Sequence, residues 1–208
     1  PFPLTKFQGH LNIVPDFDFV FLGRLVSEKG VDVLLTALSK MSDTGPVDIG
    51  PGGSGRKGRP NLLVIGDGPE RERYEGLAKE LNLSNRVSFV GAKRGAELVS
   101  SVMQGAIGVV PAVWEEPMGG VSLELIAAGR PVIVSERGGL AECVGKAGIT
   151  FPNGDVEALT AAMTRLLASE TERSELVKNA PAVLEKFDES KLIKQYETLL
   201  YDVMKCPQ

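Results

Sequence analysis

The chain of 208 residues contains few of the residues on which several common chemistries depend. It has two cysteines, Cys143 and Cys206, and one histidine, His10. Two cysteines provide neither a disulfide framework nor the paired spacing of a zinc site, and they are typical of a protein in a reducing cytoplasm. With one histidine, we expect neither a histidine-based metal centre nor a Ser-His-Asp triad within this chain.

Long apolar runs and a strong charge of one sign are also missing. No stretch approaches the ~18 to 20 apolar residues of a membrane-spanning helix. The chain begins Pro-Phe-Pro-Leu, without the layout of a signal peptide and without methionine, so we expect a piece of a longer protein. The net charge of −4 argues against a dedicated nucleic-acid binder. We therefore expect a cytoplasmic globular domain with no nucleic-acid partner.

Short apolar runs alternate with amphipathic segments along most of the chain. The runs predict six buried strands, at 17–22, 62–65, 87–90, 107–111, 132–135 and 148–151. Between them apolar residues recur at helical spacing, as in 31–41, and the chain after Gly154 is wholly helical. Such alternation predicts a parallel sheet covered on both faces. The expected fold is a doubly wound (Rossmann-like) α/β domain with a parallel six-stranded sheet and a helical C-terminal extension.

The most informative stretch is residues 114–135, WEEPMGGVSLELIAAGRPVIVS. Two carboxylates, Glu116 and Glu124, lie on either side of a glycine turn that opens a helix. A helix start presents unpaired N–H groups and the positive end of its dipole to an anion. Here the groups are the amides of Gly120, Val121 and Ser122. An acid on each side could hold sugar hydroxyls, because a carboxylate accepts two hydroxyl hydrogen bonds. The alternative is an ordinary loop acid at Glu116 and a dipole-favoured acid at Glu124.

Three loops rich in glycine and charge each follow a predicted strand, at 23–30, 66–70 and 115–120. Parallel strands bring such loops to one edge of the sheet, where ligands of doubly wound domains bind. Arg24 and Lys29, in the first loop, suit a diphosphate, because a guanidinium forks onto phosphate oxygens and an ammonium adds a point charge. The alternative is a solvated pair, with Glu28 as the partner of either cation.

Four other features are expected to be structural or ambiguous. The GxGxxG match at 50–55 is followed by no helix, so a solvated insertion is favoured. The DxD pattern at 16–18 lies on the wrong side of the sheet for a ligand. Cys143 is expected to be a small buried hydrophobe. Trp114 either lines the cleft or belongs to the core.

An ordered set of motifs resembles the C-terminal half of glycosyltransferase family 4 (group 1). The motifs are GRLVSEKG at 23–30, GDGPE at 66–70, VSFVG at 87–91 and EPMGGVSLELIAAGRPVIVSERGGLAE at 116–142, within a likeness from about Phe17 to Val203. Members of this family are retaining enzymes of the GT-B fold that use a nucleotide-sugar donor. The resemblance implies the donor-binding half of a glycosyltransferase that moves a hexose from a nucleoside-diphosphate sugar. It implies no cofactor and no metal.

The resemblance also implies roles for individual residues. Arg24 and Lys29 would bind the donor diphosphate and stabilise the charge on the leaving nucleotide. Glu116 and Glu124 match the E-x7-E pair of the family, with Glu116 on the donor sugar and Glu124 on the ribose. The other implied donor-binding residues are Gly23, Gly66, Ala92, Lys93, Met118, Gly119, Gly120, Val121 and Ser122. The family usually has Phe-Gly where this chain has Met118-Gly119, and Gly120 adds flexibility to the sugar pocket.

The expected domain organisation follows from the resemblance. Residues 1–15 form a linker or arm, residues 16–188 the nucleotide-sugar-binding domain, and residues 189–208 a C-terminal helix. That helix would pack towards an N-terminal acceptor domain of the same parent chain. The same N-terminal domain could also attach the enzyme peripherally to the cytoplasmic face of a membrane. Alone, the chain is expected to bind nucleotide weakly and to transfer no sugar.

Two other classes share part of this pattern. A sugar-nucleotide epimerase of similar architecture would have the diphosphate cradle but should lack the E-x7-E spacing. A non-catalytic nucleotide-binding module is opposed only by the intact polar set. The sequence leaves the base, the sugar and the acceptor open.

Overall fold

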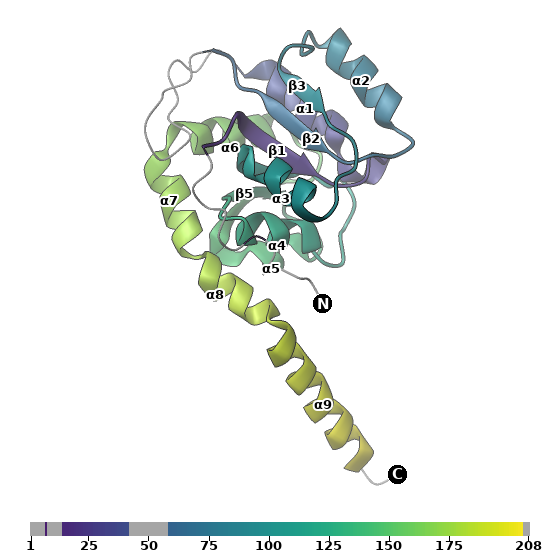
Figure 1. Ribbon diagram of the computed structural model, residues 1–208, viewed down its shortest axis with the longest axis vertical. Helices are drawn as coiled ribbons and strands as arrows, with labels where there is room; N and C mark the ends of the chain where they lie inside the picture. The colour runs from purple at the N-terminus through teal and green to yellow at the C-terminus, as the bar shows by residue number, and fades with distance from the viewer. Residues whose placement is uncertain (1–6, 8–13, 42–57, 206–208) are drawn as a thin grey trace.

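The computed structural model describes residue 7 and residues 14–41 and 58–205 (Figure 1). The GxGxxG match at 50–55, His10, Cys206 and most of the expected arm lie outside the described residues. Within the described part, no helix is both long enough and apolar enough to cross a membrane.

The sheet has six parallel strands in the order β3-β2-β1-β4-β5-β6. Their bounds are β1 Phe17–Leu22, β2 Leu62–Ile65, β3 Val87–Phe89, β4 Gly105–Val110, β5 Val132–Ser135 and β6 Gly148–Phe151. All six predicted strands are therefore confirmed. Only β3 and β4 end a residue earlier than expected, and β4 begins two residues earlier. Because β1 and β4 are neighbours, the strand order reverses between them.

Helices cover both faces of the sheet, so the domain is doubly wound as predicted (Figure 1). One core cluster joins the sheet to α1 (Val31–Lys40), α2 (Arg71–Glu80), α6 (Val156–Ala168) and α7 (Glu170–Lys178). The other joins it to α3 (Gly95–Met103), α4 (Gly120–Ala127), α5 (Leu140–Val144) and α8 (Ala180–Leu184). Successive side chains of β1 point to opposite faces of the sheet, so Phe19 and Phe21 belong to the first cluster and Val20 to the second.

Within the helical stretch predicted after Gly154, residues 170–184 form two helices, α7 and α8. α7 ends at Lys178, and α8 begins at Ala180, directly after Asn179. Pro181 lies in the first turn of α8, where the missing N–H group of proline breaks no helical hydrogen bond. Three 3-10 turns complete the described elements: η2 Ser27–Lys29, η3 Gly145–Ala147 and η4 Glu185–Phe187.

The last helix, α9 (Glu189–Lys205), extends away from the domain (Figure 1). Its large apolar side chains are exposed, with Leu192 at 41%, Tyr196 at 64% and Leu199 at 59%. The expected C-terminal helix is therefore present, and its apolar face is not covered by the described part of this chain.

Because α9 packs on almost nothing, ending the chain after Asp188 is expected to leave the domain intact. A change of 1 kcal/mol shifts the melting temperature of a domain of this size by about 2–4 °C, and we expect less than that. Thermal melts followed by circular dichroism measure the shift. A loss of more than about 5 °C would show that α9 stabilises the domain.

Candidate functional site

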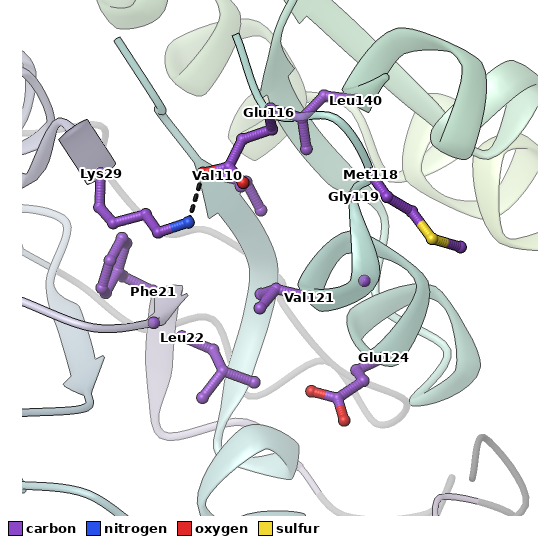
Figure 2. Close-up of a pocket in the computed structure, with 12 residues that line it drawn as sticks. Phe21, Leu22, Lys29, Val110, Glu116, Met118, Gly119, Val121, Glu124 and Leu140 are labelled. Carbon is purple, nitrogen blue, oxygen red and sulfur yellow. Dashed lines mark hydrogen bonds and ion pairs between the residues drawn. The ribbon is translucent and has the colours of Figure 1, made fainter. Parts of the chain in front are cut away.

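A cavity of about 300 Å³ opens between the carboxyl ends of β1 and β4, at the point where the strand order reverses. Ligands of doubly wound domains bind at this place. Its apolar part consists of Phe21, Leu22, Val110, Val121 and Leu140, and its polar part of Gly23, Lys29, Glu116, Gly119, Gly120 and Glu124, with Met118 beside them (Figure 2). Two of the three predicted loops, 23–30 and 115–120, therefore border one cavity.

Lys29 and Glu116 form an ion pair across the mouth of this cavity (Figure 2). Lys29 comes from η2, after β1, and Glu116 from the loop between β4 and α4. Their side chains are 30% and 16% exposed, so the pair is partly shielded from water. Glu116, and not the adjacent Glu28, is thus the carboxylate with which Lys29 forms its ion pair.

The first loop and the β4–α4 loop are fixed to each other by backbone contacts. Val113 N–H donates to the Glu28 carbonyl oxygen at 3.0 Å. Gly30 has φ +66°, and a Cβ there would lie 2.0 Å from the Pro111 carbonyl oxygen. Lys29 and Glu116 are therefore presented by loops in direct contact, which explains why they meet.

The second loop packs behind the first. Gly66 has φ +148°, and a Cβ there would lie 1.8 Å from the Gly23 carbonyl oxygen. Leu25 N–H donates to the Asp67 carbonyl oxygen at 2.9 Å, and Gly66 N–H to the Gly91 carbonyl oxygen at 2.9 Å. Gly66, predicted to contact the donor, thus lies outside the cavity lining and supports Gly23, which lines it.

The start of α4 faces the cavity, and within the described chain no side chain caps it. Gly119, Gly120 and Val121 line the cavity, whereas Ser122 is fully buried and its hydroxyl donates to the Gly119 carbonyl oxygen at 2.6 Å. The structure thus places three of the predicted turn residues at the cavity and shows a side-chain role for Ser122 that the sequence did not reveal.

The two acids of the E-x7-E pair lie at different ends of the cavity. Figure 2 shows Glu116 at the Lys29 end and Glu124 on α4, beyond Val121. Met118 is 40% exposed, and its side chain extends away from the Lys29–Glu116 pair (Figure 2). A ligand between the acids would therefore pass over the α4 amides.

Three other predicted residues lie outside the cavity lining. Arg24 is exposed in the first loop, where it and Lys29 lower the pKa of Glu28, although hydrogen bonds from the Glu28 backbone and the Ser27 hydroxyl contribute more. Ala92 is exposed after β3, and the Lys93 Nζ lies 3.8 Å from Glu97. These residues border the same edge of the sheet but do not meet Lys29.

The apolar floor of the cavity was not predicted. Phe21, Leu22 and Val110 end their strands, and the runs FDFVFL and GAIGVV mark them only as strand residues. Leu140 begins α5, held near Glu116 because Gly139 N–H donates to the Glu116 carbonyl oxygen. The Gly138-Gly139 pair, which allows this close approach, was the available signal.

Of the features expected to be structural, the DxD pattern and Cys143 lie among the described residues, and both have structural environments. Asp18 is 4% exposed and accepts from the Asn61 N–H at 2.8 Å, which ties β1 to the start of β2. Cys143 is 3% exposed, as predicted. Trp114 is 58% exposed, so it neither belongs to the core nor lines the cavity. Among the described residues, no group of three or more His, Cys, Asp and Glu side chains could hold a metal ion.

Comparisons with known proteins indicate the family and the fold of the chain. The family model described as "Glycosyl transferases group 1" matches residues 5–183. An uncharacterized glycosyltransferase of Methanocaldococcus jannaschii is 30% identical over 194 residues, 91% of this chain and 46% of that protein. The chain spans about half the length of the curated relatives it matches.

Two solved structures illustrate the likeness. Sucrose-phosphate synthase from Thermosynechococcus elongatus superposes with a TM-score of 0.74 at 29% identity, covering 98% of this chain and 49% of that one. The HepE protein of Anabaena, in complex with UDP and glucose, has a TM-score of 0.75 over 95% of this chain and 51% of that one. At 22% identity, the second likeness concerns the fold alone.

Proposed function

This chain belongs to the glycosyl transferases group 1 family, and from that premise we propose that it is the donor-binding half of a retaining glycosyltransferase. The observation that carries the proposal is one cavity, at the reversal of strand order, lined by Lys29, the start of α4 and both acids of the E-x7-E pair. The donor is a nucleoside-diphosphate hexose. The likeness to HepE, whose structure contains UDP and glucose, favours UDP as the first nucleotide to test.

The roles follow from the arrangement. Lys29 and the α4 amides bind the diphosphate and stabilise the negative charge that develops as the nucleotide leaves. Arg24, at the rim of the first loop, turns towards the same phosphates when donor is present. Glu116 accepts hydrogen bonds from the hexose and Glu124 from the ribose. Because these groups supply the positive charge, the proposed transfer needs no metal held by this chain.

The rest of the enzyme is part of the proposal. An N-terminal domain of the parent chain binds the acceptor and closes over the cavity, and α9 packs its apolar face against that domain. The exposed Leu192, Tyr196 and Leu199 support this role for α9. The parent enzyme works in the cytoplasm or at the cytoplasmic face of a membrane. Alone, the chain binds nucleotide weakly and transfers no sugar.

Titration calorimetry of the chain with UDP, GDP and ADP tests the proposal. We expect weak heat with one nucleotide and a larger affinity for its hexose conjugate, because Glu116 then gains a partner. No heat with any nucleotide contradicts donor binding, and sugar transfer by the isolated chain contradicts the need for a second domain.

Glu116→Gln is expected to strengthen the binding of UDP. In the unliganded chain Glu116 competes with the diphosphate for Lys29. Replacing its carboxylate by an amide frees the Lys29 ammonium and removes a negative charge that repels the diphosphate. Partly exposed ion pairs are worth up to about 1 kcal/mol, so UDP affinity should rise about two- to fivefold. The preference for a UDP-hexose over UDP should fall, because the sugar loses its acceptor. Calorimetry at low and high salt checks this, and weaker UDP binding would show that Glu116 is not a competitor.

A further inference from the structure

The turn that opens α4 is held from the side of the core. Gly119 N–H donates to the Cys143 Sγ at 3.2 Å, and the Ser122 hydroxyl donates to the Gly119 carbonyl oxygen at 2.6 Å. Cys143 belongs to α5 and lies in the apolar cluster beneath the turn. Both polar backbone groups of Gly119 therefore have buried side-chain partners.

These two hydrogen bonds fix two successive peptide planes. The Gly119 N–H belongs to the plane shared with Met118, and the Gly119 carbonyl belongs to the plane shared with Gly120. In a trans peptide the C=O and N–H point in opposite directions. The Gly119 carbonyl accepts from the Ser122 hydroxyl and from the Leu123 N–H at 3.1 Å, the first hydrogen bond of α4, so the Gly120 N–H on the same peptide plane points out of the open end of the helix, and Gly120 lines the cavity.

The space around Gly119 is too small for a side chain. A Cβ at this position would lie 2.7 Å from the Ser122 Oγ, 2.9 Å from the Leu140 Cδ2 and 3.1 Å from the Cys143 Cβ. A side chain at this position would displace those of its neighbours, and Gly119 with Gly120 makes a flexible pair where α4 begins. The partners of Gly119 must supply the rigidity.

We propose that Cys143 is a positioning residue for the donor site: its sulfur holds the Gly119 N–H and so aims the first amides of α4 at the phosphate and sugar oxygens. The inference rests on the proposed function, because it assigns Cys143 to the same cavity. The Cys143 side chain does not line the cavity.

The chemistry of a thiol suits this place. Burial raises the pKa of Cys143, so the thiol is neutral at physiological pH. A neutral sulfur is a weak acceptor, and it holds the amide without adding a negative charge beneath an anion site. A carboxylate in the same position would oppose the diphosphate.

The test compares Cys143→Ala with Val144→Ala by calorimetry with UDP. Val144 is the next residue of α5, is 1% exposed and lies in the same apolar cluster, so its truncation also opens the core. We expect Cys143→Ala to weaken UDP binding about three- to tenfold, the usual worth of one hydrogen bond. We expect Val144→Ala to lower the melting temperature and leave UDP affinity unchanged. Cys143→Ser, which keeps an acceptor, should recover most of the affinity.

Amide hydrogen exchange separates this inference from the proposed function. In Cys143→Ala the Gly119 amide should exchange faster than in the wild type and in Val144→Ala, whether or not UDP binds. If the wild-type chain binds none of UDP, GDP and ADP, the proposed function fails, while the exchange rate of the Gly119 amide still tests whether Cys143 holds it. Equal UDP affinity in Cys143→Ala and wild type, or equal Gly119 exchange, overturns the role of Cys143.

Discussion

Lys29→Met is expected to weaken the binding of UDP by about ten- to a hundredfold, the usual worth of a hydrogen bond to a charged group. Of the described residues that line the cavity, Lys29 is the only cation. Its loss also leaves the Glu116 carboxylate, 16% exposed, without its partner and beside the incoming diphosphate. Methionine keeps most of the length and apolar stem of lysine, so the loop should keep its conformation. Titration calorimetry with UDP measures the loss.

Lys40→Met is the matched control. Lys40 ends α1 and pairs with Glu157 of α6 on the surface, with side chains 44% and 73% exposed. The substitution removes one positive charge and one ion pair, as Lys29→Met does, but away from the cavity. UDP affinity should therefore stay at the wild-type value. Equal affinities in the two variants would mean that only net charge matters, and the diphosphate would have to bind elsewhere.

The sequence predicted the strands well because each is a short apolar run bounded by turn residues. Phe17–Leu22 and Val132–Ser135 have the predicted bounds, since both strands are covered on two faces and consist mostly of buried apolar residues. The edge of the sheet that carries the loops also followed from the alternation of strands and helices. What local pattern could not give was the strand order, which decides that β1 and β4 meet and that the cavity lies between them.

Contacts between segments distant in sequence explain where the site differs from the one that the sequence predicts. Lys29 and Glu116 are 87 residues apart, and nothing near Lys29 in sequence distinguishes Glu116 from the adjacent Glu28. The thiol of Cys143 was recognised as buried, yet its hydrogen bond to Gly119 spans 24 residues. Gly66 was assigned to the donor by motif, although its conformation serves contact with Gly23. The motifs thus located the loops at the edge of the sheet, and packing decided which of their residues line the cavity.

The expected effect of Gly66→Ala follows from that contact. Gly66 has φ +148°, which side chains rarely adopt, and the new methyl group would lie 1.8 Å from a backbone oxygen that no rotamer change can move. The first two loops must separate, and Gly23 must leave the cavity edge. We expect a loss of about 3 kcal/mol in the free energy of unfolding, typical of backbone strain combined with overpacking. Denaturant titration and thermal melts measure it.

Gly76→Ala, in the middle of α2, provides a control of the opposite sign. A Cβ at Gly76 meets nothing within 4 Å, and alanine in a helix interior is favoured over glycine by roughly 1 kcal/mol. Gly76→Ala should therefore be at least as stable as wild type and bind UDP equally well. Gly66→Ala should lose stability and UDP affinity together, because the strained backbone supports Gly23. If Gly66→Ala matched Gly76→Ala in both measurements, the contact between the first two loops would not shape the cavity.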